Sequence, residues 1–294
     1  WGGYATASSC FHLGGFPGGD KGGVEDVYLV YPVGTAEPLP LVVFAHGCCK
    51  DSPNDTATQY DAVLRHLASH GIVVASYSTC LWGCDYEKFG ADQLYVIDAL
   101  ESHKHLHPIM HQVNFSSLGV MGHSMGGASS VFSGSSGRPG LRAVGTVAFA
   151  WMSPGIDDVI RNGKVPTLFL CGQNDTVNTC DRIKQKFELT PPHLQGKNVF
   201  AELRDADHLE IQKPLPGGRF DSYMVQFMLC YLNHDRAACE NIYGADDALC
   251  NNNLFILCET HYLTPPAQQA DLLPHASVLR IMAALVVFIV MMAV

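Results

Sequence analysis

The chain has 294 residues, of which 47% are hydrophobic and 16% charged, so it is long enough to bury a full core and does not have the composition of a disordered protein. It carries 18 Lys and Arg against 28 Asp and Glu, a net charge of −10, and has no basic cluster. This balance argues against nucleic acid as a partner.

Apolar runs of strand length alternate with helical patterns along most of the chain. Residues 1–23 are rich in glycine and are predicted to be irregular. The run at 24–32 alternates and is predicted to be an edge strand, whereas 39–47 is continuously apolar, as in a strand with both faces covered. Further strands are predicted at 71–77, 117–122, 143–151, 165–172 and 198–203, and helices at 58–69, 91–102, after Ser124, at 180–189 and at 222–232. This order predicts an α/β fold with a mostly parallel central sheet and helices on both faces.

The segment "GHSMG" follows the predicted strand at 117–122 and precedes a helix. Gly122 and Gly126 flank Ser124 in the G-x-S-x-G pattern, which places a serine on a sharp turn between a strand and a helix. Side chains at the two glycines would collide with the adjacent backbone. The pattern predicts Ser124 as a nucleophile, and the arrangement as an α/β-hydrolase fold.

A serine hydroxyl becomes an effective nucleophile only when a base takes its proton. In this fold the acid and then the histidine follow the serine along the chain. Asp175 comes directly after the strand at 165–172, and His208 follows the strand at 198–203. The predicted catalytic residues are therefore Ser124, His208 as base and Asp175 as its orienting acid. Competing carboxylates are Asp157, Asp158, Asp205 and Asp207.

Cleavage of an ester also needs donors for the oxygen that becomes negative in the transition state. We expect the backbone N–H of Met125, which follows the serine, to be one donor. The loop after the strand at 39–47 should supply the other, from the N–H of Cys48. His46 and His123 are expected to be structural. No cofactor and no metal are expected, since His103, His107 and His111 lie on a predicted helix that Pro108 interrupts, without carboxylate ligands.

The chain resembles the cutinase-like polyester hydrolases, the group that includes bacterial poly(ethylene terephthalate) hydrolases. The similar segments are "LASHGIVV", "LGVMGHSMGG", "VPTLFLCGQND" and "AACEN", between about residues 27 and 250. The resemblance implies the same triad and oxyanion donors, and it assigns Trp151 to substrate binding. It also implies a C-terminal disulfide from Cys239, with Cys250 as the expected partner. More distantly, the chain is similar to chlorophyllases and platelet-activating-factor acetylhydrolases.

Two departures from that family bear on the substrate. Its usual aromatic residue beside the oxyanion hole corresponds to Cys48, and no cysteine closely follows His208. We therefore expect a serine hydrolase that cleaves carboxylic esters through an acyl-enzyme, of the polyester-hydrolase type. The alternatives are a lipid or chlorophyll esterase of the same fold, and a non-catalytic adhesion protein. The expected partner is an ester substrate, bound by a monomer.

Eleven cysteines and three Asn-X-Ser/Thr sequons, at Asn54, Asn114 and Asn174, favour an oxidising compartment, although Asn174 is expected to be buried. Bridges between Cys48 or Cys49 and Cys80 or Cys84 are a hypothesis, with free thiols as the alternative. Because the count is odd, at least one thiol is unpaired within the chain.

Residues 281–294 are an uninterrupted apolar run, shorter than the ~20 residues of a membrane span. Such a run after a polar spacer is typical of a lipid-anchor signal or a short tail anchor, and the alternatives are a packed helix or a truncated membrane span. We expect a secreted or cell-surface protein that can attach to a membrane through this tail. The predicted organisation is an irregular segment (1–23), an α/β-hydrolase catalytic domain (24–261), and a spacer with the hydrophobic tail (262–294).

Overall fold

The apolar runs of the sequence form one sheet in the computed structural model, which describes residues 2–13, 15, 26–35, 38–47, 58–79, 85–194, 196–213, 219–244 and 249–260. Within these residues the sheet has nine strands in the order β1-β2-β4-β3-β5-β6-β7-β8-β9. The strands are β1 (Thr6–His12), β2 (Asp26–Pro32), β3 (Leu39–Ala45), β4 (Val73–Ser78), β5 (Val113–His123), β6 (Leu141–Val147), β7 (Thr167–Gly172), β8 (Val199–Leu203) and β9 (Phe255–Thr260).

The middle of the sheet is parallel and its two edges are antiparallel. Strands β4, β3, β5, β6, β7 and β8 pair in parallel with one another, in this order. β1 and β2 run antiparallel at one edge, and β9 runs antiparallel to β8 at the other. This arrangement matches the predicted α/β class with a mostly parallel sheet.

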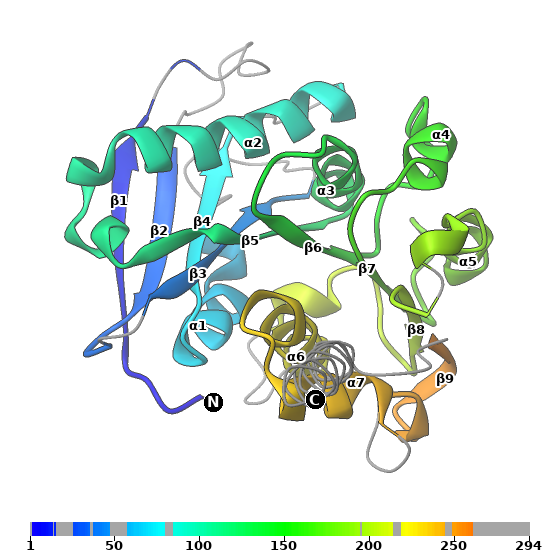
Figure 1. Ribbon diagram of the computed structural model, residues 1–294. Helices are drawn as coiled ribbons and strands as arrows, with labels where there is room; N and C mark the ends of the chain where they lie inside the picture. Colours follow the sequence, from blue (N-terminus) through cyan, green and yellow to red (C-terminus); the bar gives the residue numbers. More distant parts are fainter. Residues whose placement is uncertain are drawn as a thin grey trace, which may run out of the picture.

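Seven α-helices of the described residues cover both faces of the sheet. In Figure 1, α2, α3, α4 and α5 lie on one face, and α1, α6 and α7 lie on the other. Their bounds are α1 (Asp61–Ser69), α2 (Tyr86–Ser102), α3 (Met125–Ser135), α4 (Ile156–Arg161), α5 (Cys180–Phe187), α6 (Asp221–Leu232) and α7 (Arg236–Tyr243). Short 3₁₀ turns lie at Thr58–Tyr60, Lys104–Leu106, Pro108–His111, Pro192–Leu194, Glu210–Gln212 and Leu249–Asn251.

The core lies on both sides of the central strands. Every residue of β3 is buried, as its continuous apolar run predicts. One apolar cluster joins this sheet to α1, α6 and α7, and two others join it to α2 and to α3, α4 and α5. The sheet is therefore covered on both faces, which leaves the carboxyl ends of its parallel strands for the polar residues of the site.

The prediction for residues 1–23 is wrong over Thr6–His12, which form β1. This segment pairs along its whole length with β2, from Thr6 opposite Pro32 to His12 opposite Asp26. Its hydrogen bonds come from a partner more than a dozen residues away, so local composition did not reveal it. As a consequence β2, predicted to be an edge strand, lies second in the sheet.

Other differences concern element bounds. The predicted strand at 143–151 ends at Val147, and α2 and β5 start earlier than predicted, at Tyr86 and Val113. The sequence reading also missed α4, α7 and β9. The first two are short helices of six and eight residues, for which few periodic positions exist.

The disulfide predicted between Cys239 and Cys250 is wrong. Cys239, on α7, pairs with Cys230 on the preceding helix α6, because the packing of these two helices brings the Cα atoms to 4.7 Å. Cys250 pairs with Cys258 on β9, and Cys171 pairs with Cys180. Cys10 is an exposed free thiol. The hypothetical bridges among Cys48, Cys49, Cys80 and Cys84 lie outside the described residues.

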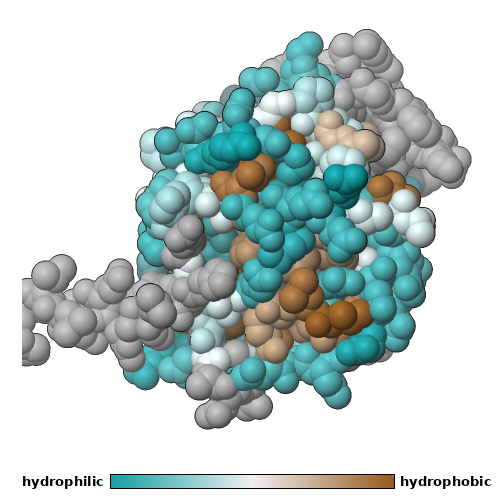
Figure 2. Space-filling model, turned by 90° about the vertical axis from the view of Figure 1, so that its right-hand side faces the viewer, coloured by the Kyte–Doolittle hydropathy of each residue, from teal (hydrophilic) through white to brown (hydrophobic). Residues whose placement is uncertain are grey.

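The β9 side of the molecule exposes some apolar surface. Leu254, Ile256 and Leu257 are each about two-fifths exposed, at 39%, 41% and 40%. Figure 2, which views this side, shows a hydrophobic area in its lower half surrounded by hydrophilic residues. No helix of the described residues is long and apolar enough to cross a bilayer, and the run at 281–294 lies outside them.

Candidate active site

Ser124 lies on a sharp turn between β5 and α3. Its backbone has φ 53° and ψ −116°, a left-handed conformation that side chains rarely adopt. Three backbone hydrogen bonds hold it: the N–H donates to the Val147 carbonyl, and the Ser124 carbonyl accepts from the N–H groups of Ala128 and Ala150. The strained turn is thus fixed by the neighbouring strand β6 and by the first turn of α3.

The glycines of the turn are required by close backbone contacts. A Cβ atom on Gly122 would lie 2.1 Å from the carbonyl oxygen of Gly126, and one on Gly126 would lie 2.1 Å from that of Ala45. A Cβ on Gly127 would lie 2.7 Å from the Cβ of Phe149. The spacing of glycines in the sequence therefore reflects how closely α3 packs against β3 and β5.

Asp175 lies in the loop between β7 and α5, and its side chain is fully buried. Its Oδ1 accepts hydrogen bonds from the backbone N–H groups of Val177 and Asn178, both at 2.8 Å. The other carboxylate oxygen, Oδ2, is left to face His208. The loop thus satisfies one side of the carboxylate and directs the other at the histidine.

His208 connects the acid to the serine. Its Nδ1 is 2.7 Å from Asp175 Oδ2, and its Nε2 is 3.2 Å from Ser124 Oγ. A carboxylate only accepts hydrogen bonds, so Nδ1 carries the proton and Nε2 of the neutral ring presents its lone pair to the serine hydroxyl. The three residues predicted from the sequence are therefore in hydrogen-bonding contact, in the order acid, histidine, serine.

The other candidate carboxylates lie elsewhere. Asp157 forms an ion pair with Lys186, and Asp158 with Arg161. Asp207 binds Lys213 at 2.9 Å, which lowers the pKa of Asp207 below its usual range. None of the hydrogen bonds of the described residues joins one of these carboxylates to the His208 ring.

A buried hydrogen-bond chain supports His208 from behind. Burial lowers the pKa of His123 to about 3, so its ring is neutral. Its Nε2 is 2.8 Å from the His208 carbonyl and must donate, which leaves Nδ1 to accept from the Tyr60 hydroxyl at 2.9 Å. The Tyr60 oxygen in turn accepts from the Gly47 N–H and from Gln212 Nε2. This chain links the end of β3 to the backbone of His208.

The proposed oxyanion donors are only partly described. Met125 is the first residue of α3, where backbone N–H groups have no partner inside the helix. Cys48 lies outside the described residues. His46, just before it, is fully buried with its Nδ1 2.6 Å from the Gly47 carbonyl, and burial lowers its pKa to about 4. This arrangement is consistent with the structural role expected of His46.

Trp151 lies in a turn that follows the carboxyl end of β6, three residues after Ala148. The Arg182 guanidinium lies 5.3 Å from the centre of its ring, a cation–π contact from α5. Trp151 contributes to an open hollow of about 500 Å³ together with Met152, Ser153, Gly155, Ile156, Asp157, Asp158 and Lys186. The residue predicted to bind substrate therefore borders space that a ligand could enter.

Exposed apolar side chains lie next to these site residues in the sequence. Met152 is 68% exposed and follows Trp151; Val177 is 59% exposed, two residues after Asp175; Leu209 is 51% exposed and follows His208. We call these three residues the apolar rim. All three follow the carboxyl ends of parallel strands, which lie at one edge of the sheet.

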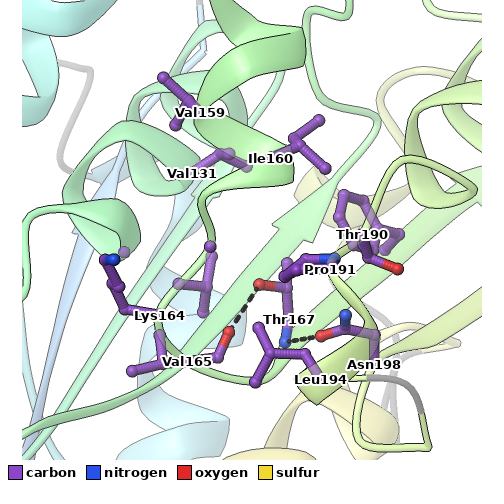
Figure 3. A pocket seen from close by; sticks show the side chains of 14 residues that line it. Val131, Val159, Ile160, Lys164, Val165, Thr167, Thr190, Pro191, Leu194 and Asn198 are labelled. Carbon is purple, nitrogen blue, oxygen red and sulfur yellow. Dashed lines mark hydrogen bonds between the residues drawn. The ribbon is translucent and has the colours of Figure 1, made fainter.

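A second, enclosed cavity lies at the opposite ends of the strands (Figure 3). Its volume is about 10 Å³, room for about one water molecule. Apolar residues such as Val131 and Ile160 form most of its wall, and Asn198 Oδ1 accepts from the Thr167 N–H at 2.8 Å. It is too small for an ester substrate and contains none of the predicted site residues.

Sequence reasoning missed the polar residues that surround the three predicted ones. Asn178 contacts Ser124 directly, whereas Tyr60 bonds to His123 and Gln212 bonds to Tyr60, and none of the three belongs to a motif with fixed spacing. The disulfide Cys171–Cys180, which encloses the Asp175 loop, was also missed. Its only sequence signal was two cysteines on either side of "GQND". Asn174, expected to be buried, is exposed at the start of the same loop.

The chain is also similar in sequence to a known protein family. A family model described as PETase, PET hydrolase-like, matches residues 9–253. The match begins within β1 and ends before β9, and it includes all the site residues described above.

Proposed function

The chain belongs to the PET hydrolase-like family, ester hydrolases of the α/β-hydrolase fold, and we propose that it cleaves carboxylic esters through an acyl-serine formed on Ser124. The observation that carries this proposal is the contact of Ser124 with His208 and of His208 with Asp175. A family match supports ester hydrolysis in general, and this geometry supports the serine mechanism in particular.

The reaction proceeds in two halves. Ser124 Oγ attacks the ester carbonyl carbon while its proton passes to His208 Nε2. The carbonyl oxygen becomes negative and accepts hydrogen bonds from the N–H groups of Met125 and Cys48. The intermediate then expels the alcohol, which takes the proton from His208. Water, deprotonated by His208, attacks the acyl-serine, and the carboxylic acid leaves as Ser124 regains its proton.

The substrate class proposed is an ester with an apolar acyl or polymer chain. The apolar rim of Met152, Val177 and Leu209 supports it, because exposed apolar side chains beside a site gain free energy when an apolar ligand covers them. A polyester and a lipid both have this character. Rates on polyester film, phospholipid and short acyl esters, measured side by side, distinguish them, and a preference for soluble short esters alone would contradict the proposal.

The first experiment replaces the nucleophile. Ser124→Ala should lower turnover of p-nitrophenyl butyrate by at least about a thousandfold and abolish labelling by a fluorophosphonate probe. Ser135→Ala, at the end of α3, is the matched control and should keep both. Retained turnover in Ser124→Ala would assign the chemistry to another residue. An unlabelled and inactive wild-type protein would instead favour the non-catalytic alternative.

The three disulfides found among the described residues fit an extracellular protein. We further propose that the protein is secreted or displayed at the cell surface, with residues 262–294 directing attachment to a membrane. Mass spectrometry of the mature protein checks this, since an intact C-terminal tail on soluble secreted protein would exclude anchoring.

A further inference from the structure

Asn178 lies beside the nucleophile Ser124, although it belongs to no sequence motif. It is in the loop between β7 and α5, three residues after Asp175, and is only 3% exposed. Its backbone N–H donates to Asp175 Oδ1 at 2.8 Å. The backbone of Asn178 therefore helps to hold the Asp175 carboxylate in place.

The side chain of Asn178 reaches across to the serine turn. Its Nδ2 donates to the Ala148 carbonyl at 2.8 Å and lies 3.5 Å from Ser124 Oγ. The contact with a carbonyl, which only accepts, sets which end of the amide is nitrogen. Ala148 itself has φ 49°, so the acceptor belongs to a second left-handed position beside the turn. One amide N–H fixes the side chain, and the other is free to face Oγ.

Ser124 Oγ has a lone pair that can accept a hydrogen bond from this donor. Its single proton faces His208 Nε2, which leaves two lone pairs. One is used in the attack on the substrate, and the other can accept from Asn178. At 3.5 Å this contact is at the outer limit of a hydrogen bond, and catalytic hydrogen bonds commonly shorten when substrate binds.

We propose that Asn178 is a further catalytic residue, whose side-chain amide stabilises negative charge on Ser124 Oγ. The proposal depends on the proposed serine mechanism. Oγ becomes more negative when its proton passes to His208 during acylation, and again when the bond from Oγ to the acyl carbon breaks during deacylation. Hydrogen bonds to charged oxygen are roughly twice as strong as neutral ones, so the amide favours both transition states over the resting enzyme. Asn178 neither gains nor loses a proton.

This role is distinct from that of the oxyanion donors. The N–H groups of Met125 and Cys48 are proposed to face the oxygen of the substrate carbonyl, whereas Asn178 faces the oxygen of the enzyme. Asn178→Ala should therefore slow the release of p-nitrophenol in the burst phase and the steady state that follows. We expect each rate to fall about tenfold, with KM changed less than about twofold.

A matched variant separates this role from a loss of stability. Asn198 is as buried as Asn178, at 2% exposed, and lies near the cavity of Figure 3 at the opposite ends of the strands. Asn198→Ala and Asn178→Ala should both lower the melting temperature, but only the second should slow catalysis. Equal kcat values in the two variants would overturn the proposal.

A second variant tests the electrostatic origin of the effect. Asn178→Asp keeps the shape of the side chain and replaces the donor by an acceptor, so kcat should fall below that of Asn178→Ala. It also maintains the test if the Ala variant does not fold. A kcat in Asn178→Asp equal to wild type would overturn the proposal. If wild-type protein is inactive or Ser124→Ala is fully active, the serine mechanism fails and not this inference alone.

Discussion

Ser124 and the residues that contact it illustrate how single positions carry strain and polarity in this molecule. Backbone strain of the kind seen at Ser124 costs about 1–3 kcal/mol. Hydrogen bonds to Val147, Ala128 and Ala150 hold the residue in that conformation. The benefit is a nucleophile whose oxygen needs no reorientation before it attacks, since its position is set by the backbone around it.

The buried histidine beside the serine makes a prediction for stability against pH. His123 contacts Tyr60 and His208, and burial lowers its pKa from 6.5 to about 3, although the charge of Asp175 acts in the opposite direction. Below pH 6.5 the unfolded chain binds a proton at this residue that the folded protein does not bind. Stability from this group is therefore complete above pH 6.5 and is lost as pH falls toward 3, by about 2 kcal/mol between pH 7 and pH 5.

Urea denaturation at pH 7 and pH 5 measures this contribution. His123→Gln retains an amide donor and acceptor but does not titrate, so its free energy of unfolding should fall less than that of the wild type over this interval. An identical fall in the two proteins would show that His123 does not remain neutral in the folded state.

At the scale of elements, the loop between β7 and α5 contains both the acid Asp175 and the amide of Asn178. Asp175 and Asn178 lie between Cys171 and Cys180, whose Cα atoms are 5.5 Å apart. The cysteines are buried at the end of β7 and the start of α5. The disulfide therefore encloses a loop whose backbone N–H groups hold the carboxylate, and it limits the movement of that loop relative to the sheet.

Removal of this disulfide should lower both stability and activity. Replacing Cys171 and Cys180 by Ala should reduce the free energy of unfolding by about 2.5 kcal/mol, from the entropy of a loop of this length. The bridge Cys230–Cys239 has the same sequence separation of 9 and joins α6 to α7, away from the site. Its removal should cost similar stability and leave kcat unchanged. A similar kcat in both double variants would show that the enclosed loop does not need its disulfide to position Asp175.

At the scale of the whole molecule, the sheet order gathers residues that are far apart in sequence. Ser124, Asp175 and His208 follow β5, β7 and β8, which run parallel in the middle of the sheet. Parallel strands place their carboxyl ends at the same edge, so loops after these strands meet there. Helices cover both faces of the sheet (Figure 1), and the side chains of the three residues meet in the loops at the carboxyl ends of these strands.

The apolar rim at that edge predicts a preference among substrates. Leu209→Ser should lower kcat/KM for long acyl esters about fivefold while short esters change little, because only a long chain covers this side chain. Leu257→Ser, on β9, is the matched control for an exposed leucine and should leave the ratio of the two rates unchanged. Equal losses on long and short esters in Leu209→Ser would mean that the rim does not contact the acyl chain.

Local patterns in the sequence were enough to predict the α/β class, the central strands and the three residues that meet at the sheet edge. Each of these predictions depends on neighbours in the chain. The signals are the continuous apolar run of β3, the glycines around Ser124, and the position of Asp175 and His208 shortly after strands. Such local signals are sufficient because a residue that directly follows a parallel strand lies at the carboxyl end of that strand, which is a known side of the sheet.

Only the tertiary structure decided the features that depend on contacts between distant segments. The pairing of β1 with β2 and of β9 with β8, the disulfide partners of Cys239 and Cys250, and the contact of Asn178 with Ser124 all join residues through space. Edge-strand hydrogen bonds are made with whichever strand lies beside them, and a cysteine pairs with whichever partner is within about 6 Å. No local period encodes these distances, so they became visible only when the chain was folded.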